Sequence, residues 1–258
     1  MSDSNDLLLT YVLRQGDRAL ILAQRLLEEI THAPEIEEDM ALSNLALDLI
    51  GQARGLYSYA GEVRGPDGEG NISDEDHFAY WREQHEFLSP LLVEQPNEDF
   101  AHVIARQFLH DAAALPYWQA MTSSTDETLA ALAGKAVKET AYHLRHSRSW
   151  VVRLGDGTDE SHRRMQAAID QLWRYTGELF EHDEVEDELV ASGIAADPGD
   201  LHDAWRETVV RALEEATLDV PDEGIMQSGG RHGRHGEQFS YVIGELQVLA
   251  RAHPGATW

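Results

Sequence analysis

The sequence contains no cysteine, which excludes disulfide bonds, thiolate nucleophiles and cysteine-ligated metal sites. It also lacks any apolar run close to the roughly 20 residues that a membrane-spanning helix needs. No basic stretch precedes Leu7, so a signal peptide is not expected. We therefore expect a cytoplasmic protein without a membrane partner.

Lysine is scarce as well. It occurs only at Lys135 and Lys138, and 47 acidic residues outnumber the 20 Lys and Arg, which gives a net charge of −27. Nucleic acids and anionic membranes carry charge of the same sign, so neither is expected to bind. Surface carboxylates hold water in concentrated salt, and we hypothesise a salt-loving source organism. A GC-rich genome, which favours Arg, Ala, Asp and Glu codons, is the alternative explanation.

Apolar residues recur at intervals of three and four along most of the chain, a period that places them on one face of a helix. No alternating pattern long enough for a strand appears, so we predict an all-α fold. The expected helices cover residues 5–32, 35–64, 97 to beyond 115, 126–154, 158–180, 197–213 and 235–251. Their expected caps are Asn97, Thr125 or Asp126, Thr158 or Asp159, and Asp197 at N-termini, and Gly155 at a C-terminus.

Two long helices, an irregular crossing over 65–96 and two more long helices are the layout of a ferritin-like four-helix bundle with one long connection. We expect a single domain over residues 1–258. Its bundle core would occupy residues 5–155, and additional C-terminal helices would occupy residues 158–253.

A ferritin-like bundle raises the question of a di-iron site, which takes one Glu from each of two helices and a Glu-x-x-His from each of the other two. The second expected helix contains no histidine and carries Asp48 near its centre. The third offers Asp111, and the fourth offers Glu139 with His143 four residues later instead of three. We predict that the chain has no catalytic residue and binds no metal or other cofactor. Asp48, Asp111, Glu139 and His143 are candidate remnants of a lost metal site.

Two pairs do have the three-residue spacing, Glu29 with His32 and Asp99 with His102. Both lie at expected helix ends, too far from the bundle centre to converge on a metal. Chance pairs are expected in a chain with 47 acidic residues and 13 histidines.

Polar residues also recur inside the second helix, at Asn44, Asp48 and Gln52. An unpaired polar group in a core costs about 1–3 kcal/mol. We hypothesise that hydrogen bonds, together with Lys135 or Lys138 in place of metal cations, satisfy such interior groups. The alternative is that both lysines are surface residues.

The segment 229–236, GGRHGRHG, is a basic and glycine-rich loop in an acidic chain. It follows no expected strand, so it is neither a dinucleotide fingerprint nor a P-loop. It could hold an anion such as a CoA phosphate, contact a partner, or serve as a plain loop.

Four blocks are specific enough to compare with known families. They are QRLLEEITHAPEIEEDMALSNLALDLIGQAR within residues 20–54, LLVEQPNEDFAHVIARQFLHDA from Leu91, KAVKETAYHLRHSRSWVVRLGDGTD from Lys135 and LWRYTGELF from Leu172. These blocks resemble the structural subunits of phenylacetyl-CoA epoxidases (phenylacetate-CoA oxygenases). The resemblance extends from the first helix to the terminal HPGATW.

The resemblance implies a role in a monooxygenase complex that epoxidises the ring of phenylacetyl-CoA with O2 and NADPH. A homologous catalytic subunit would carry the di-iron centre, and a reductase would carry FAD and an iron–sulfur cluster. This chain would be the metal-free scaffold that docks the catalytic subunit, with homo-oligomerisation as a further option. The alternatives are a di-iron oxygenase or oxidase in its own right, and a CoA-binding subunit that uses Arg231 and Arg234.

Overall fold

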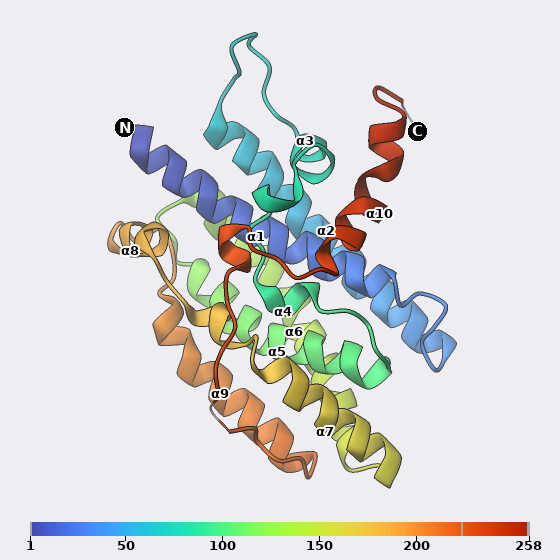
Figure 1. Cartoon of the computed structure of the whole chain (residues 1–258). Coiled ribbons are helices and arrows are strands. Elements are labelled where there is room, and N and C mark those ends of the chain that lie inside the picture. Colours follow the sequence, from blue (N-terminus) through green and yellow to red (C-terminus); the bar gives the residue numbers. More distant parts are fainter. Residues whose placement is uncertain (1, 223, 257–258) are drawn as a thin grey trace. The chain divides into compact units, whose positions relative to one another are not determined.

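The computed structural model describes residues 2–222 and 224–256. Within them the chain forms ten α-helices, three short 3-10 helices and no strand; Figure 1 labels the α-helices. The predicted all-α fold is confirmed. The terminal block HPGATW begins within the described residues, whereas its last two residues, Thr257 and Trp258, lie outside them.

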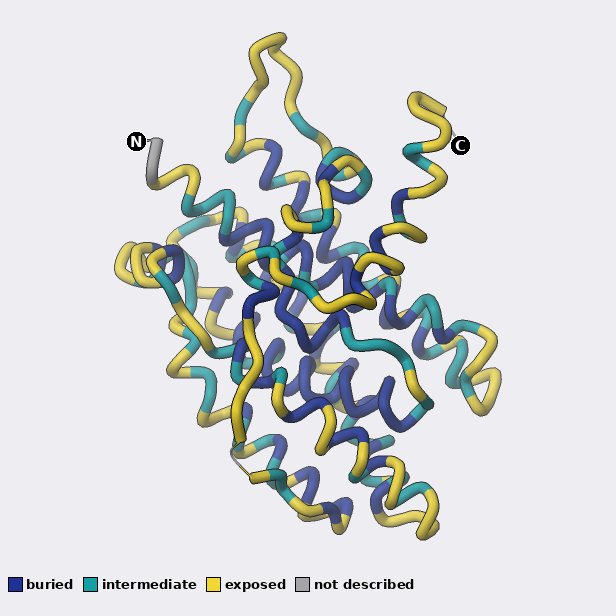
Figure 2. Tube along the Cα trace, viewed as in Figure 1, coloured by how far each residue is buried: buried dark blue, intermediate teal, exposed yellow. Residues whose placement is uncertain are grey.

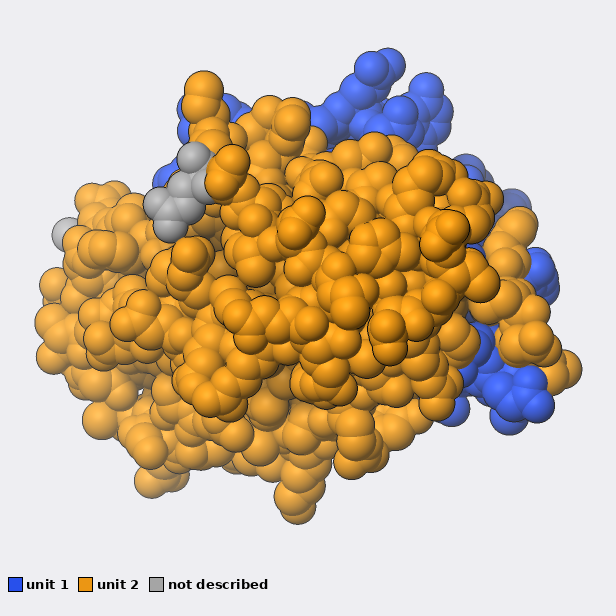
Figure 3. Space-filling model, turned by 90° about the horizontal axis from the view of Figure 1, so that it is seen from below, with its two compact units in different colours: residues 1–31, 37–96, 229–258 blue, residues 32–36, 97–228 orange. Residues whose placement is uncertain are grey.

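The helices gather into two compact units, which Figure 3 colours separately. Unit 1 contains residues 1–31, 37–96 and 229–258, and unit 2 contains residues 32–36 and 97–228. The elements of unit 1 are α1 (Ser2–Leu27), α2 (Ile36–Arg64), α3 (Glu75–Tyr80), η1 (Gln84–Glu86), α4 (Leu91–Glu94), η3 (Gly230–His232) and α10 (Phe239–Ala252). Those of unit 2 are α5 (Phe100–Met121), α6 (Glu127–Gly155), α7 (Asp159–Trp173), η2 (Gly177–Phe180), α8 (Glu184–Ala191) and α9 (Pro198–Glu215).

The long helices required by the ferritin-like fold are present as two pairs. Unit 1 contains α1 and α2, unit 2 contains α5 and α6, and the irregular crossing precedes α5 as expected. The additional C-terminal helices α7 to α10 are present too. The single domain over residues 1–258 stays a prediction.

In unit 1, α1 and α2 approach each other closely at Gly16. A Cβ atom at this position would lie 2.6 Å from the ring of Tyr57. A glycine in a helix interior costs about 1 kcal/mol relative to alanine. Gly16 is tolerated here because it lets the aromatic ring pack directly on the α1 backbone.

The apolar stripe of α2 reaches both the core and the surface. Ala46 is completely buried, Ile50 is partly buried, and Leu47 is 62% exposed. The polar row on the same helix is divided in a similar way, since Gln52 is buried and Asn44 is exposed. The expectation that the whole row is interior is therefore wrong at Asn44.

In unit 2, α5 is the central helix. Every residue from Ala101 to Ala114 is buried, as the dark segment in Figure 2 illustrates, and α5 packs against α6, α7 and α9. A helix that is covered on all sides belongs to the middle of a bundle. It continues through Pro116 and ends at Met121.

Three predicted helix starts are confirmed. The side chains of Asp126, Thr158 and Asp197 accept hydrogen bonds of 2.9, 3.2 and 2.8 Å from backbone N–H groups two or three residues later. Each bond satisfies one of the amides that a helix N-terminus leaves without a helical partner. These short-range contacts are the reason that the sequence signals were reliable there.

Two caps differ from the prediction. Helix α5 is capped by Asp99 and not by Asn97, since the Asp99 side chain accepts a 2.9 Å hydrogen bond from the backbone N–H of His102. Helix α6 includes Gly155, where a Cβ atom would lie 2.4 Å from the carbonyl oxygen of Ala216. Close packing, and not a left-handed cap, explains this glycine.

Other boundaries shift by several residues. The helix expected over 158–180 ends at Trp173, because the following amides bond to carbonyls three residues back and form tighter turns. The acidic stretch that follows contributes the separate helix α8. Helix α10 begins at Phe239 and not at His235, whose side chain has another role described below.

Candidate functional site

In unit 2, Asp111 of α5 is completely buried. Gln107 Nε2 donates to Asp111 Oδ1 at 2.7 Å, and Ser147 Oγ of α6 lies 2.9 Å from Oδ2. His110 Nδ1 lies 3.3 Å from Oδ1. Burial raises the pKa of the Asp111 carboxyl well above its usual range, and the hydrogen bonds from Ser147 and Gln107 offset only part of this effect. The site therefore favours a neutral carboxylic acid.

A neutral Asp111 also satisfies Ser147. The Ser147 hydroxyl has a single proton, but its oxygen lies within hydrogen-bond distance of both Asp111 Oδ2, at 2.9 Å, and the His143 carbonyl oxygen, at 3.0 Å. When Asp111 is protonated, it donates to Ser147 Oγ, and Ser147 in turn donates to the His143 carbonyl. This relay joins Asp111 of α5 to the backbone of α6.

The structure brings together two of the four candidate remnants. Asp111 and His143 are both completely buried in unit 2, and Ser147 Oγ lies 2.9 Å from Asp111 Oδ2 and 3.0 Å from the backbone carbonyl oxygen of His143. Glu139 instead forms an ion pair with the exposed Lys135, with 3.3 Å between Glu139 Oε1 and Lys135 Nζ. Asp48 lies on α2 in unit 1 and is partly buried.

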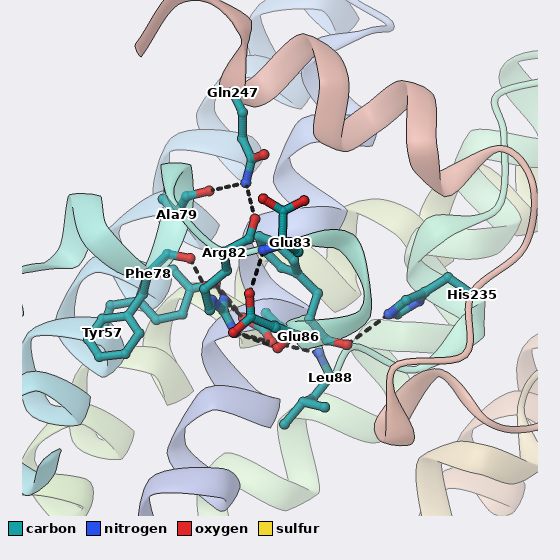
Figure 4. Close-up of polar contacts among 11 residues, drawn as sticks. Tyr57, Phe78, Ala79, Arg82, Glu83, Glu86, Leu88, His235 and Gln247 are labelled. Carbon is teal, nitrogen blue, oxygen red and sulfur yellow. Dashed lines mark hydrogen bonds and ion pairs between the residues drawn. The ribbon is translucent and has the colours of Figure 1, made fainter. Parts of the chain in front are cut away.

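Unit 1 has its own buried carboxylate, Asp17 of α1, and Figure 4 labels its partners Tyr57, Arg82 and Leu88. Tyr57 Oη donates to Asp17 Oδ1 at 2.5 Å, and the backbone N–H of Leu88 donates to Oδ2 at 2.7 Å. Both terminal nitrogens of Arg82 donate to the same carboxylate, Nη1 at 3.0 Å. Burial, together with the negative charge of Asp17, raises the pKa of Tyr57 well above its usual range, so Tyr57 stays a donor.

The Arg82 side chain is held in place by backbone carbonyls. Its Nε donates to Phe78 O at 2.7 Å, and its Nη1 also donates to Glu86 O at 2.9 Å. The side-chain amide of Gln247 in α10 donates to two backbone carbonyls of this region, Ala79 O at 3.1 Å and Arg82 O at 2.9 Å (Figure 4). A guanidinium that is fixed in this way is a preorganised partner for a buried carboxylate.

The glycine-rich loop is buried only in part: Gly229 and Gly230 are buried, whereas His232 and Arg234 are exposed. The His235 side chain is completely buried, with Nδ1 2.6 Å from Glu94 Oε2 and Nε2 2.8 Å from the Phe87 carbonyl oxygen. A Cβ at Gly233, where φ is +73°, would lie 2.0 Å from a carbonyl oxygen, and one at Gly230 would lie 2.2 Å from another. Close packing explains these glycines, and the alternatives of an anion site, a partner contact and a plain loop stay predictions.

The described residues do not fit a di-iron centre. Helix α2 contains no histidine, and the buried carboxylate of α1 already faces a guanidinium. In unit 2 the buried carboxyl of α5, Asp111, is hydrogen-bonded to the side chains of Gln107 and Ser147. Among residues 2–222 and 224–256, no three acidic or histidine side chains gather in a way that could hold a metal ion.

The hypothesis of an interior lysine is wrong. Lys135 and Lys138 are both exposed, and the cation that faces a buried carboxylate is Arg82, whose side chain is 4% exposed. Sequence reasoning missed Arg82 because it lies in the irregular crossing, where no helical period indicates which side chains point inward. The arginine-rich, lysine-poor composition was the available signal.

The two pairs with three-residue spacing lie where they were expected. Asp99 caps α5, with its carboxylate bonded to the backbone of His102. Glu29 and His32 lie beyond the end of α1 at Leu27.

Among the described residues, no helix is long and apolar enough to cross a membrane.

Together these features define an all-α protein of the ferritin-like class, in which buried carboxyls of the long helices are compensated within the chain. The family described as "Phenylacetic acid catabolic protein" matches residues 1–258, and the chain belongs to this family. It is 48% identical over 251 residues to one of the subunits of the 1,2-phenylacetyl-CoA epoxidase of Escherichia coli (strain K12), and the match covers 97% of this chain and 99% of that protein. The resemblance seen in the four sequence blocks is confirmed.

Proposed function

We propose that this chain is the scaffold subunit of a phenylacetyl-CoA epoxidase complex in phenylacetate catabolism. The family description and the name of the 48% identical relative support the pathway and the complex. The scaffold role means that the chain docks and stabilises a homologous di-iron catalytic subunit and carries no catalytic residue itself. We place this complex in the cytoplasm.

The observation that carries this proposal is the internal compensation of the buried carboxyls. Asp17 is neutralised by Arg82, and Asp111 is buried with hydrogen bonds from Gln107 and Ser147. A di-iron site needs several ionised carboxylates that are open to the metals. Here the interior groups stabilise the helices, which suits a structural subunit.

The cofactors of the complex would then be bound by other subunits. We propose that the di-iron centre lies in the catalytic subunit, and that FAD, an iron–sulfur cluster and the NADPH site belong to a reductase. The role of this chain is protein–protein docking, within one ferritin-like domain.

The test is the iron content of the purified chain after expression with iron supplementation, alone and together with the catalytic subunit. We expect iron only in the co-purified complex. Near-stoichiometric paired iron in the isolated chain would instead support a di-iron enzyme in its own right. Titration of the isolated chain with phenylacetyl-CoA, alongside an Arg231→Ala/Arg234→Ala variant, tests the CoA-binding alternative.

A further inference from the structure

A groove of about 510 Å³ opens on unit 1 between α3 and α10. Its apolar lining includes Trp81, Leu246 and Leu249, and its acidic lining consists of Asp74 and Asp76. Trp81 is 44% exposed and Leu249 is 53% exposed. Large apolar side chains left in contact with water at one place are typical of interaction sites.

Helix α10 has further exposed apolar side chains that do not line the groove. Tyr241 and Val248 are 62% and 63% exposed, whereas Val242, Ile243 and Gln247 face inward. The groove itself combines large apolar side chains with carboxylates, which suits an amphipathic protein segment that presents apolar and basic side chains together.

Hydrogen bonds hold the α10 wall of the groove against α3 and the residue pair that follows it. Gln247 donates to Ala79 O in α3 and to Arg82 O beyond it, and Arg251 Nε donates to Tyr80 O at 3.0 Å. Arg251 Nη1 further pairs with Glu83 at 3.0 Å. A preformed surface loses little conformational entropy when a partner binds.

Charge indicates the nature of the occupant. The lining contains two aspartates and one histidine, His253, and neither lysine nor arginine. Burial, and then the like charges of Asp74 and Glu75, raise the pKa of Asp76, whereas Arg54 lowers it. A further cation beside Asp76 would offset the repulsion from these like charges. A second copy of a chain with net charge −27 would add to that repulsion.

We propose that the groove between α3 and α10 receives an amphipathic segment of the catalytic subunit, with an apolar side chain against Trp81 and Leu249 and a Lys or Arg beside Asp76. This inference rests on the proposed scaffold function and names the surface that performs it. Apolar anchors supply most of the affinity at such sites, and the charges set orientation and association rate.

The experiment measures the affinity between this chain and the purified catalytic subunit at low and at moderate salt. Two variants address the groove, Leu249→Asp and Asp76→Arg. Each has a matched control elsewhere: Leu47→Asp on α2, where Leu47 is 62% exposed, and Asp203→Arg on α9, where the Asp203 side chain is fully exposed. Thermal melts followed by circular dichroism verify that all four variants fold.

We expect both groove variants to weaken binding by about tenfold or more, which corresponds to roughly 1.4 kcal/mol. Asp76→Arg should also flatten the salt dependence, whereas both controls stay within about twofold of the wild type. Wild-type affinity for both groove variants would overturn the inference while leaving the scaffold function intact. Weakening by Leu47→Asp alone would place the docking surface on α2 and would likewise overturn it.

Two further outcomes separate this inference from the function on which it rests. If the wild-type chain itself does not bind the catalytic subunit, the scaffold proposal fails and this inference fails with it. If sedimentation shows a wild-type homodimer that Leu249→Asp dissociates, the occupant is a second copy of the chain, and the inference of a basic partner segment is wrong.

Discussion

Replacing Arg82 with methionine removes the cation that faces Asp17 in the core of unit 1. The arginine side chain is 4% exposed and the aspartate side chain is not exposed at all. Methionine keeps much of the aliphatic volume, so the change addresses the charge and the hydrogen bonds more than the packing. It leaves a buried carboxylate with Tyr57 and the Leu88 amide as its remaining donors.

Removing one partner of a buried ion pair costs about 3–5 kcal/mol, because the other charge stays in a medium that solvates it poorly. Arg82 also donates to Phe78 O and Glu86 O, and these carbonyls lose their partner. We expect the free energy of unfolding to fall by about 3–5 kcal/mol, which for a chain of this size lowers the melting temperature by roughly 6–20 °C.

Urea denaturation followed by circular dichroism measures the effect. The control is Arg164→Met, which removes a half-exposed arginine with a 2.6 Å ion pair to Glu160 and should cost less than about 1 kcal/mol. In the double variant Asp17→Asn/Arg82→Met both charges are gone, so the combined loss should be smaller than the sum of the single losses by about 1 kcal/mol or more. Strict additivity, or a loss below about 1 kcal/mol for Arg82→Met, would refute the account of Asp17 as a buried anion held by Arg82.

Three further predictions follow from the packing and the charges. Because the pKa of Asp111 is raised in the folded state, its contribution to stability is fully present below the unfolded pKa near 4 and is lost as the pH rises through the folded pKa. The Asp111→Asn variant should therefore gain stability relative to the wild type from about pH 4 upward, by at most about 1.4 kcal/mol per pH unit. Urea midpoints of the two proteins that run parallel over this pH range would contradict the prediction. Gly16→Ala should lower the melting temperature, because the new Cβ would lie 2.6 Å from the Tyr57 ring. Gly134→Ala in α6, where no atom lies within 4 Å of the new Cβ, should raise the free energy of unfolding by about 0.5–1 kcal/mol. Equal stabilisation by both substitutions would show that the α1 backbone moves away from Tyr57. If the salt-loving hypothesis is correct, the melting temperature rises between low and molar salt, and a flat profile favours the codon explanation.

Local signals in the sequence were sufficient for much of the fold. The period of three and four predicts the long helices, and Asp126, Thr158 and Asp197 mark three of their starts. A helix cap depends on a hydrogen bond to a residue two or three positions later, so the nearby sequence contains both partners. The reasoning is insufficient where the partner is distant in the sequence. Gly155 was predicted as a helix cap, but the carbonyl oxygen of Ala216 packs against it and leaves no room for a Cβ atom.

The sequence predicted only part of what the structure shows at the candidate remnants of a metal site. The missing histidine of α2 and the four-residue spacing of Glu139 and His143 already argued against di-iron ligation. The sequence also singled out Asp111, but the protein groups that satisfy it were not predictable. Ser147 lies 36 positions away on another helix, and only the packing of α5 against α6 brings the two side chains within 2.9 Å.

The sequence by itself therefore determined the all-α class, most of the helices, the family and the absence of thiol chemistry. These properties depend on composition, on periodicity and on short blocks of residues. Tertiary structure decided which groups pair with the buried carboxyls: Arg82 donates to Asp17 across 65 positions, and His235 Nδ1 lies within hydrogen-bond distance of Glu94 across 141. Burial makes such pairings necessary, since an unpaired charge in the core is costly, but only the packing of the helices determines which residue supplies the partner.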